Sequence, residues 1–215
     1  MFQNFRDPVS GLMHLVAAVA AAVGLAGLLV LGRTDGAKEA ALAVYGSSLV
    51  LMFSASAAYH SIRSGRRITR WLHRLDHASI YLLVAGTYTP VCLYFFKGIY
   101  GWGLLGTVWC IGFTGIGLKL FAAKVPRWLT ASISLLMGWL GLVAIPEVVR
   151  TMPVAAMVWL VLGGLFFSVG AVVYITKRPN YFPRVFGFHE IWHIFVILGC
   201  LSHYIVIAVY VAPAA

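Results

Sequence analysis

Charged residues are scarce in this chain. They make up 10% of its 215 residues and only six are acidic, whereas 61% of the residues are hydrophobic. A soluble globular domain carries about a quarter charged residues, so the composition excludes that class and predicts an integral membrane protein. The formal net charge of +10 comes from basic residues that fall between apolar runs. That pattern reports membrane orientation and contact with anionic lipid headgroups, and it argues against nucleic acid as a partner.

Cysteine is also scarce. The three cysteines, Cys92, Cys110 and Cys200, are odd in number and lie within apolar runs. This predicts buried small hydrophobic residues and excludes a disulfide framework. The first apolar run is too long for a signal peptide, so we expect it to be a retained first helix.

Charged residues divide the chain into seven charge-free intervals, each close to the ~20 residues that a membrane-spanning helix needs. We therefore predict an all-α integral membrane protein whose residues 1–215 form one seven-helix bundle. Six helices with a re-entrant segment is the less favoured alternative. A short turn at Lys97 separates the third and fourth intervals and is predicted to be an interfacial hairpin. The intervals are 8–32, 40–62, 77–96, 98–118, 128–146, 151–176 and 191–215, with the last helix ending near residue 212.

The basic residues predict the orientation of this bundle. With seven spans, 12 of the 16 Lys and Arg residues fall on the side of the N-terminus. Cytoplasmic loops carry the excess of Lys and Arg, so we expect the N-terminus in the cytoplasm and the C-terminus outside. The loops are too short to hold a soluble domain.

Five unusual polar residues are predicted to meet in the cytoplasmic leaflet. Ser56 and His60 lie near the end of the second helix, Asp76 opens the third, and His189 and His193 open the seventh. The two histidines of the seventh helix are four residues apart and therefore share one helix face. Polar side chains at this depth are costly, which makes the cluster a predicted functional site.

Three neutral imidazoles with one open position are typical of catalytic zinc. We expect His60, His189 and His193 to bind zinc, with Asp76 completing the site directly or through a water molecule that zinc activates. Ser56 is placed to donate to a substrate carbonyl or to orient a ligand. The alternative is that the histidines only form hydrogen bonds between helices, and that Asp76 pairs with a neighbouring arginine.

Three further histidines have separate predictions. His14 lies one to two turns into the first helix and is a candidate neighbour of the same site. His73 is predicted to be a solvated loop residue. His203 lies about 15 Å along the helix axis from His193, too far to share a metal with it, and is expected to bond another helix.

The segment His189-Glu190-Ile191-Trp192-His193 also satisfies H-E-x-x-H, the metalloprotease signature in which Glu is the general base. An intramembrane metalloprotease is therefore an alternative. However, such proteases take their third ligand from a later helix, and only His203 follows here. The third ligand must come from upstream, where His60 is the natural choice, and the role of Glu190 stays open. A retinal-binding protein is excluded because the last segment has no Lys for a Schiff base.

Several motifs resemble one known family. Residues 56–60 fit S-x-x-x-H, Asp76 follows in the segment 73–77, and His189 and His193 fit H-x-x-x-H. Together with Ile-Tyr at 80–81 and Ala-Gly-Thr-Tyr-Thr-Pro at 85–90, they resemble the bacterial haemolysin III branch of the progestin and adiponectin receptor family, which is related to alkaline ceramidases. The resemblance covers nearly the whole chain.

This resemblance implies a seven-helix bundle in the bacterial inner or plasma membrane with zinc near its cytoplasmic face. It implies His60, His189 and His193 as zinc ligands, Asp76 reaching zinc through water, and amide hydrolysis of a ceramide-like lipid in membrane-lipid homeostasis. Hormone binding does not carry over, because the long N-terminal region of the animal receptors is missing. The haemolysin label is consistent with an indirect effect.

Two hypotheses follow. The leading one is a zinc-dependent membrane hydrolase of lipid amides or esters, with Asp76 as general base and Ser56 assisting the oxyanion. The second is a non-enzymatic lipid sensor or receptor in which zinc is structural and a lipid tail occupies the bundle. Membrane lipids are the expected partners in both, and the hypotheses leave protein partners open.

Overall fold

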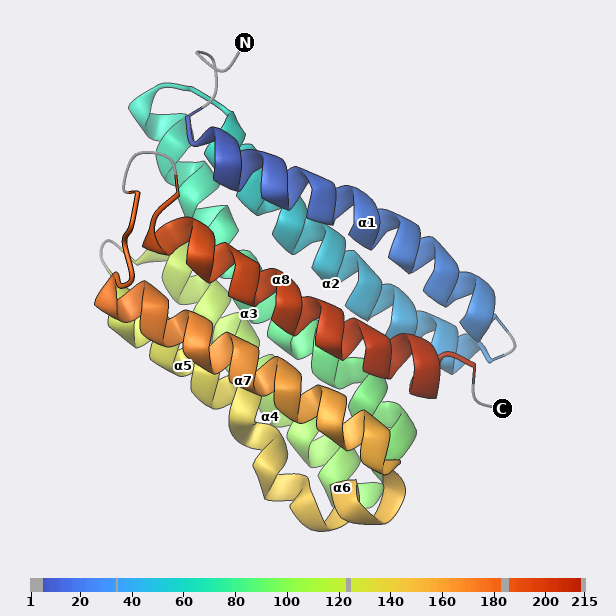
Figure 1. Cartoon of the computed structure of the whole chain (residues 1–215). Coiled ribbons are helices and arrows are strands. Elements are labelled where there is room, and N and C mark those ends of the chain that lie inside the picture. Colours follow the sequence, from blue (N-terminus) through green and yellow to red (C-terminus); the bar gives the residue numbers. More distant parts are fainter. Residues whose placement is uncertain (1–5, 34, 123–124, 183–185, 214–215) are drawn as a thin grey trace.

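The computed structural model describes residues 6–33, 35–122, 125–182 and 186–213. Within these ranges, seven segments are long and apolar enough to cross a membrane, which confirms the predicted all-α, seven-helix class. The helices run antiparallel in one bundle (Figure 1). They are α1 (Pro8–Gly32), α2 (Gly36–Ser61), α3 (Arg66–Phe95), α4 (Gly98–Phe121), α5 (Arg127–Trp139), α6 (Ile145–Thr151), α7 (Val154–Thr176) and α8 (Phe188–Val206).

The differences from prediction include two earlier helix starts and one interrupted helix interior. α3 begins at Arg66 rather than at residue 77, because its first turns are rich in arginine, a good helix former that ends the apolar stretch without ending the helix. α2 begins at Gly36 because the Asp35 side chain accepts backbone N–H groups of the first turn at 2.9 and 3.3 Å. The fifth span is divided, since a 3₁₀ turn at Leu140–Ala144 joins α5 to α6.

The outer surface of the bundle is apolar. On α1 the side chains of Leu12, Val16 and Val23 are more than half exposed. This suits a bundle surrounded by lipid, where an apolar side chain gains little by turning inward. Cys92 and Cys200 are buried as predicted, but the prediction for Cys110 is wrong, because this residue on α4 is exposed. A small apolar side chain can face lipid as readily as the interior of the bundle.

Close packing of neighbouring helices depends on small residues. A Cβ added to Gly115 of α4 would lie 2.6 Å from the ring of Tyr81 on α3, so only glycine permits this approach. At the α3–α4 turn, Gly98 adopts a positive φ of 57°, a conformation that glycine adopts readily. This turn is the predicted hairpin.

The order of packing brings four helix ends together. Successive helices pack in pairs, and α8 returns to lie against α1 (Figure 1). The start of α1, the end of α2, the start of α3 and the start of α8 therefore meet at one end of the bundle. This is the end where sequence analysis places the polar cluster.

Candidate metal centre

Three histidines converge where the end of α2 meets the start of α8. His60 lies in the last turn of α2, and His189 and His193 lie four residues apart on one face of α8. One ligand nitrogen from each lies within 4.8 Å of the other two. The Nε2 atoms of His60 and His189 are 3.3 Å apart. These are the three predicted ligands, and they form a group able to bind one metal ion.

His193 fits a metal ligand for a second reason. Its side chain is 0% exposed, and neither ring nitrogen finds a hydrogen-bond partner among the described residues. Burying an imidazole whose nitrogens form no hydrogen bonds is costly, and native proteins usually provide a partner for each buried polar atom. A metal ion bound by one ring nitrogen of His193 would give that nitrogen a partner. A set of three imidazoles suits zinc and other transition metals.

His14 of α1 covers one face of His193. The two rings stack with centroids 4.0 Å apart and planes 26° apart. His14 is itself buried, and its ring nitrogens also lack hydrogen-bond partners in the described part of the chain. It does not belong to the group of three, so the structure places it beside the predicted ligands, as the sequence suggested for a neighbour.

Asp76 and Ser56 form a second polar layer near these histidines. Asp76 on α3 is 5% exposed, and its Oδ2 atom lies 3.4 Å from Nδ1 of His77. Ser56 on α2 is also buried, and neither Oδ2 of Asp76 nor the Ser56 hydroxyl has a hydrogen-bond partner within the described residues. Asp76 stands outside the group whose atoms lie within 4.8 Å. Apart from its contact with His77, the Oδ2 atom of this buried carboxylate forms no hydrogen bond among the described residues.

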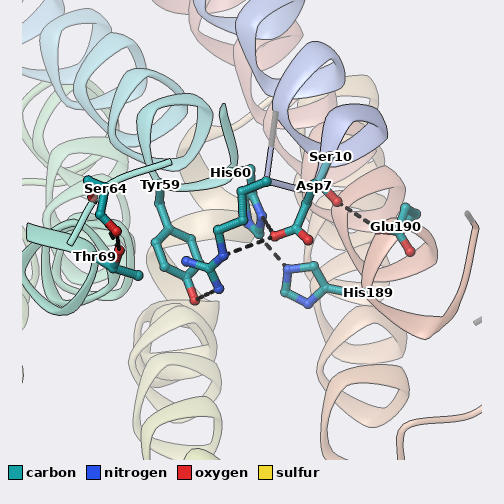
Figure 2. A network of polar contacts seen from close by, with 9 residues as sticks. Asp7, Ser10, Tyr59, His60, Ser64, Thr69, His189 and Glu190 are labelled. Atoms are coloured by element: carbon teal, nitrogen blue, oxygen red, sulfur yellow. Dashed lines mark hydrogen bonds and ion pairs between the residues drawn. The ribbon is translucent and has the colours of Figure 1, made fainter. Parts of the chain in front are cut away.

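Two contacts that sequence reasoning missed tie α1 to the histidine-bearing helices (Figure 2). Oδ2 of Asp7 lies 3.1 Å from Nδ1 of His60. The Ser10 hydroxyl donates to Oε1 of Glu190 at 2.8 Å. These partners are 53 and 180 residues apart in sequence, and no local pattern signals such pairs. The one sequence feature that could have drawn attention to Asp7 is the rarity of acidic residues in this chain.

Glu190 acts in the structure as a capping residue of α8. Its Oε2 atom accepts the Gly187 backbone N–H at 2.8 Å, and its Oε1 atom accepts the Ser10 hydroxyl. The side chain thus supplies the glutamate half of a capping box at the start of the helix, whose N-cap residue is Gly187. Both oxygens of Glu190 thus accept hydrogen bonds, one within the start of α8 and one from α1.

Two other histidines lie outside the centre. His73 is exposed but lies on α3 with its ring centroid 4.2 Å from that of His77, so the predicted loop is wrong because α3 begins earlier than expected. His203 lies 3.3 Å from the carbonyl oxygen of Leu160 on α7, which confirms the predicted bond to another helix.

Replacing His203 by alanine is therefore expected to leave metal binding unchanged. The substitution removes the contact with α7 but no atom of the three-histidine group. The metal-to-protein ratio of purified His203→Ala, measured by elemental analysis, should equal that of the parent protein. A ratio below half of the parent value would contradict the assignment of His203 to helix packing.

The fold and the site together define a heptahelical membrane protein with a buried histidine cluster at one end of its bundle. The chain belongs to the Haemolysin-III related family, whose family model matches residues 2–204. It is 32% identical to Hemolysin-3 of Bacillus cereus, over 100% of this chain and 96% of that protein. It is 35% identical to the Hemolysin-3 homolog of Bacillus subtilis (strain 168), over 78% and 75% of the two chains.

More distant relatives are eukaryotic. The chain is 31% identical to the adiponectin receptor protein of Drosophila melanogaster, over 67% of this chain and 35% of the receptor. It is 26% identical to heptahelical transmembrane protein 1 of Arabidopsis thaliana, over 74% and 52%. These matches agree with the predicted resemblance and with a multi-pass membrane protein.

Proposed function

We propose that this protein is a zinc-dependent membrane hydrolase that acts on lipid amides or esters. The observation that carries the proposal is the group of three buried or half-buried imidazoles, beside which Asp76 and Ser56 hold polar atoms without partners in the described chain. Such a collection of unsatisfied polar groups is costly in a purely structural core. It is expected where a metal, a water molecule and a substrate bind.

The ligand role falls to His60, His189 and His193. A zinc ion held there would supply Lewis acidity, which would polarise a substrate carbonyl and lower the pKa of a water molecule towards ~7. The Asp76 carboxylate is proposed to accept the proton from the attacking water and to return it to the leaving amine or alcohol. The Ser56 hydroxyl donates a hydrogen bond to the oxygen of the carbonyl as negative charge develops there.

A surface cavity beside this end of the bundle supports a lipid as the substrate. It has a volume of about 440 Å³. Its wall includes Tyr59, the residue before His60, together with Arg66 and Arg70 of α3. The apolar outer surface of the helices contacts lipid tails, while the arginines of this open depression suit an anionic headgroup. We infer that the substrate arrives from the cytoplasmic leaflet of the bacterial inner or plasma membrane.

The proposal predicts that fatty acid is released from a lipid amide or ester only by the metal-loaded protein. Protein purified in detergent is incubated with a ceramide and with a matched ester, and the released fatty acid is quantified. Release should stop after the metal is removed by a chelator and return when zinc is added. If protein carrying one zinc per chain releases no fatty acid from either lipid, the hydrolase assignment fails.

A receptor-like sensor is the second candidate, favoured by the similarity to a protein named as an adiponectin receptor. In that case zinc would hold α2 and α8 together without taking part in a reaction. The same assay separates the two functions, since a sensor binds zinc and lipid but releases no product.

A further inference from the structure

The start of α1 contacts the candidate metal centre from outside the ligand set. Asp7, Ser10 and His14 are spaced by three and four residues, which places them along one side of the helix start. Each contacts a different part of the site, through bonds of 3.1 and 2.8 Å for Asp7 and Ser10 and through ring stacking for His14. Figure 2 shows Asp7 and Ser10 directed towards their partners. The first turn of α1 therefore spans the gap between α2 and α8.

The contact between Asp7 and His60 fixes which nitrogen of His60 is available. Nδ1 of His60 lies 3.1 Å from Oδ2 of Asp7, so Nδ1–H donates to this carboxylate. The other nitrogen, Nε2, then presents its lone pair and is the atom that lies 3.3 Å from Nε2 of His189. A carboxylate that accepts the outer N–H of a metal-binding histidine sets both the tautomer and the ring orientation. Asp7 has this geometry.

The backbone and the preceding residue hold Asp7 in place. The Asp7 N–H donates to the backbone carbonyl of His60 at 2.9 Å. Arg6 donates from Nη2 to the Tyr59 hydroxyl at 2.8 Å, and its Nε lies 3.6 Å from Oδ2 of Asp7. Arg6 also lies over the Tyr59 ring at 4.2 Å. The segment before α1 is thus attached to two consecutive residues at the end of α2.

Among the described residues, the Asp7 carboxylate contacts His60 and Arg6 rather than the helix that it precedes. It occupies the N-cap position of α1, where aspartate commonly accepts backbone N–H groups, yet its side chain makes no capping hydrogen bond. Its side chain is 42% exposed, so burial does not fix it either. The nearer of its two ion-pair contacts is therefore the one with His60, at 3.1 Å, and the other is with Arg6, at 3.6 Å.

We propose that Asp7 is a positioning residue for the metal centre, whose carboxylate orients His60 for metal binding. This inference rests on the metal-binding part of the proposed function and not on hydrolysis. The hydrogen bond from Ser10 to Glu190 has a similar role at α8, because it holds the start of the helix that carries His189. Asp7 sets the affinity of the site for metal without touching the ion.

The test measures zinc affinity and cobalt spectra of the full-length protein in detergent. Asp7→Ala should raise the dissociation constant for zinc, measured by competition with a chelator, by ~10- to 100-fold. Asp7→Asn keeps an oxygen acceptor but loses the charge, so its affinity should fall between those of the parent and of Asp7→Ala. The visible absorption of bound Co²⁺ should change in Asp7→Ala, because the geometry of one imidazole ligand changes.

Asp35→Asn is the matched control for Asp7→Asn. Asp35 lies at the end of α2 away from His60, and the substitution removes the same negative charge. Its zinc affinity and Co²⁺ spectrum should equal those of the parent. If Asp7→Ala proves unstable without metal, Asp7→Asn decides the question. Parent-like affinity in a folded Asp7 variant overturns the positioning role while leaving the hydrolase proposal intact. A parent protein that binds no zinc overturns both, and a parent that binds zinc but releases no fatty acid overturns hydrolysis alone.

Discussion

Replacing Asp76 by alanine is expected to lower lipid hydrolysis by at least ~100-fold while the protein keeps its zinc. Asp76 is buried on α3, outside the group of three histidines, and its Oδ2 atom has no hydrogen-bond partner among the described residues. Its loss therefore removes the proton acceptor but none of the three imidazole ligands. Turnover of a lipid amide and the zinc-to-protein ratio are measured on the same preparation.

Ser79→Ala provides a control on the same helix. Its hydroxyl donates only to the backbone carbonyl of Asp76, at 2.7 Å, so the variant disturbs the local helix without changing the carboxylate. Turnover by Ser79→Ala should stay within a few-fold of the parent, as is common when no catalytic proton transfer is lost. Asp76→Asn, which keeps the side-chain volume, should fall as far as Asp76→Ala. Full turnover by zinc-loaded Asp76→Ala would show that another group acts as the base.

Replacing His193 by alanine is expected to abolish stoichiometric zinc binding and, with it, hydrolysis. Loss of a direct ligand should cost more than the ~10- to 100-fold in affinity that follows loss of a ligand's hydrogen-bond partner. His193 is the most buried of the three histidines, so no water molecule from bulk solvent readily takes its place. Elemental analysis of the purified variant should find much less than one zinc per chain.

His203→Ala is the control for this variant, because both substitutions remove an imidazole from α8 and leave space behind. Thermal unfolding in detergent, followed by circular dichroism, shows whether each variant folds. His189→Ala should also lose zinc and offers a second test at a less buried position. If His193→Ala and His189→Ala both keep one zinc per chain, the ion is bound elsewhere and the three-histidine site is wrong.

The fold was largely predictable because membrane-spanning helices obey a strong rule. Backbone polar groups must be satisfied within each segment in lipid, so apolar length between charges predicts the spans. The same rule failed where a helix continues beyond the membrane, as α3 does from Arg66 to residue 77. It also could not detect the 3₁₀ turn at Leu140–Ala144, which has the same apolar composition as the helix on either side.

The convergence of the three histidines was predictable from topology. An antiparallel bundle with seven spans places the end of the second helix and the start of the last helix at the same end, and helical spacing puts His189 and His193 on one face. Spacing also predicted that His203 could not join them. The structure adds that one ring nitrogen from each of the three lies within 4.8 Å of the other two.

The contacts from α1 were not predictable in the same way. Asp7 meets His60 across 53 residues, and its identity as a partner depends on how the segment before α1 turns onto the end of α2. Hydropathy carries no information on this packing. The capping role of Glu190, in contrast, follows from a local pattern, a glutamate at the third helical position, which the H-E-x-x-H motif obscured.

X-ray absorption at the zinc edge of the purified protein tests the central claim most directly. The account predicts about one zinc per chain with three nitrogen ligands at ~2.0–2.1 Å, whose outer-shell scattering is that of imidazole rings. This signal should lose an imidazole contribution in any His60, His189 or His193 variant that retains metal. Absence of zinc after incubation with zinc, or sulfur ligands at ~2.3 Å, would contradict a three-histidine metal centre.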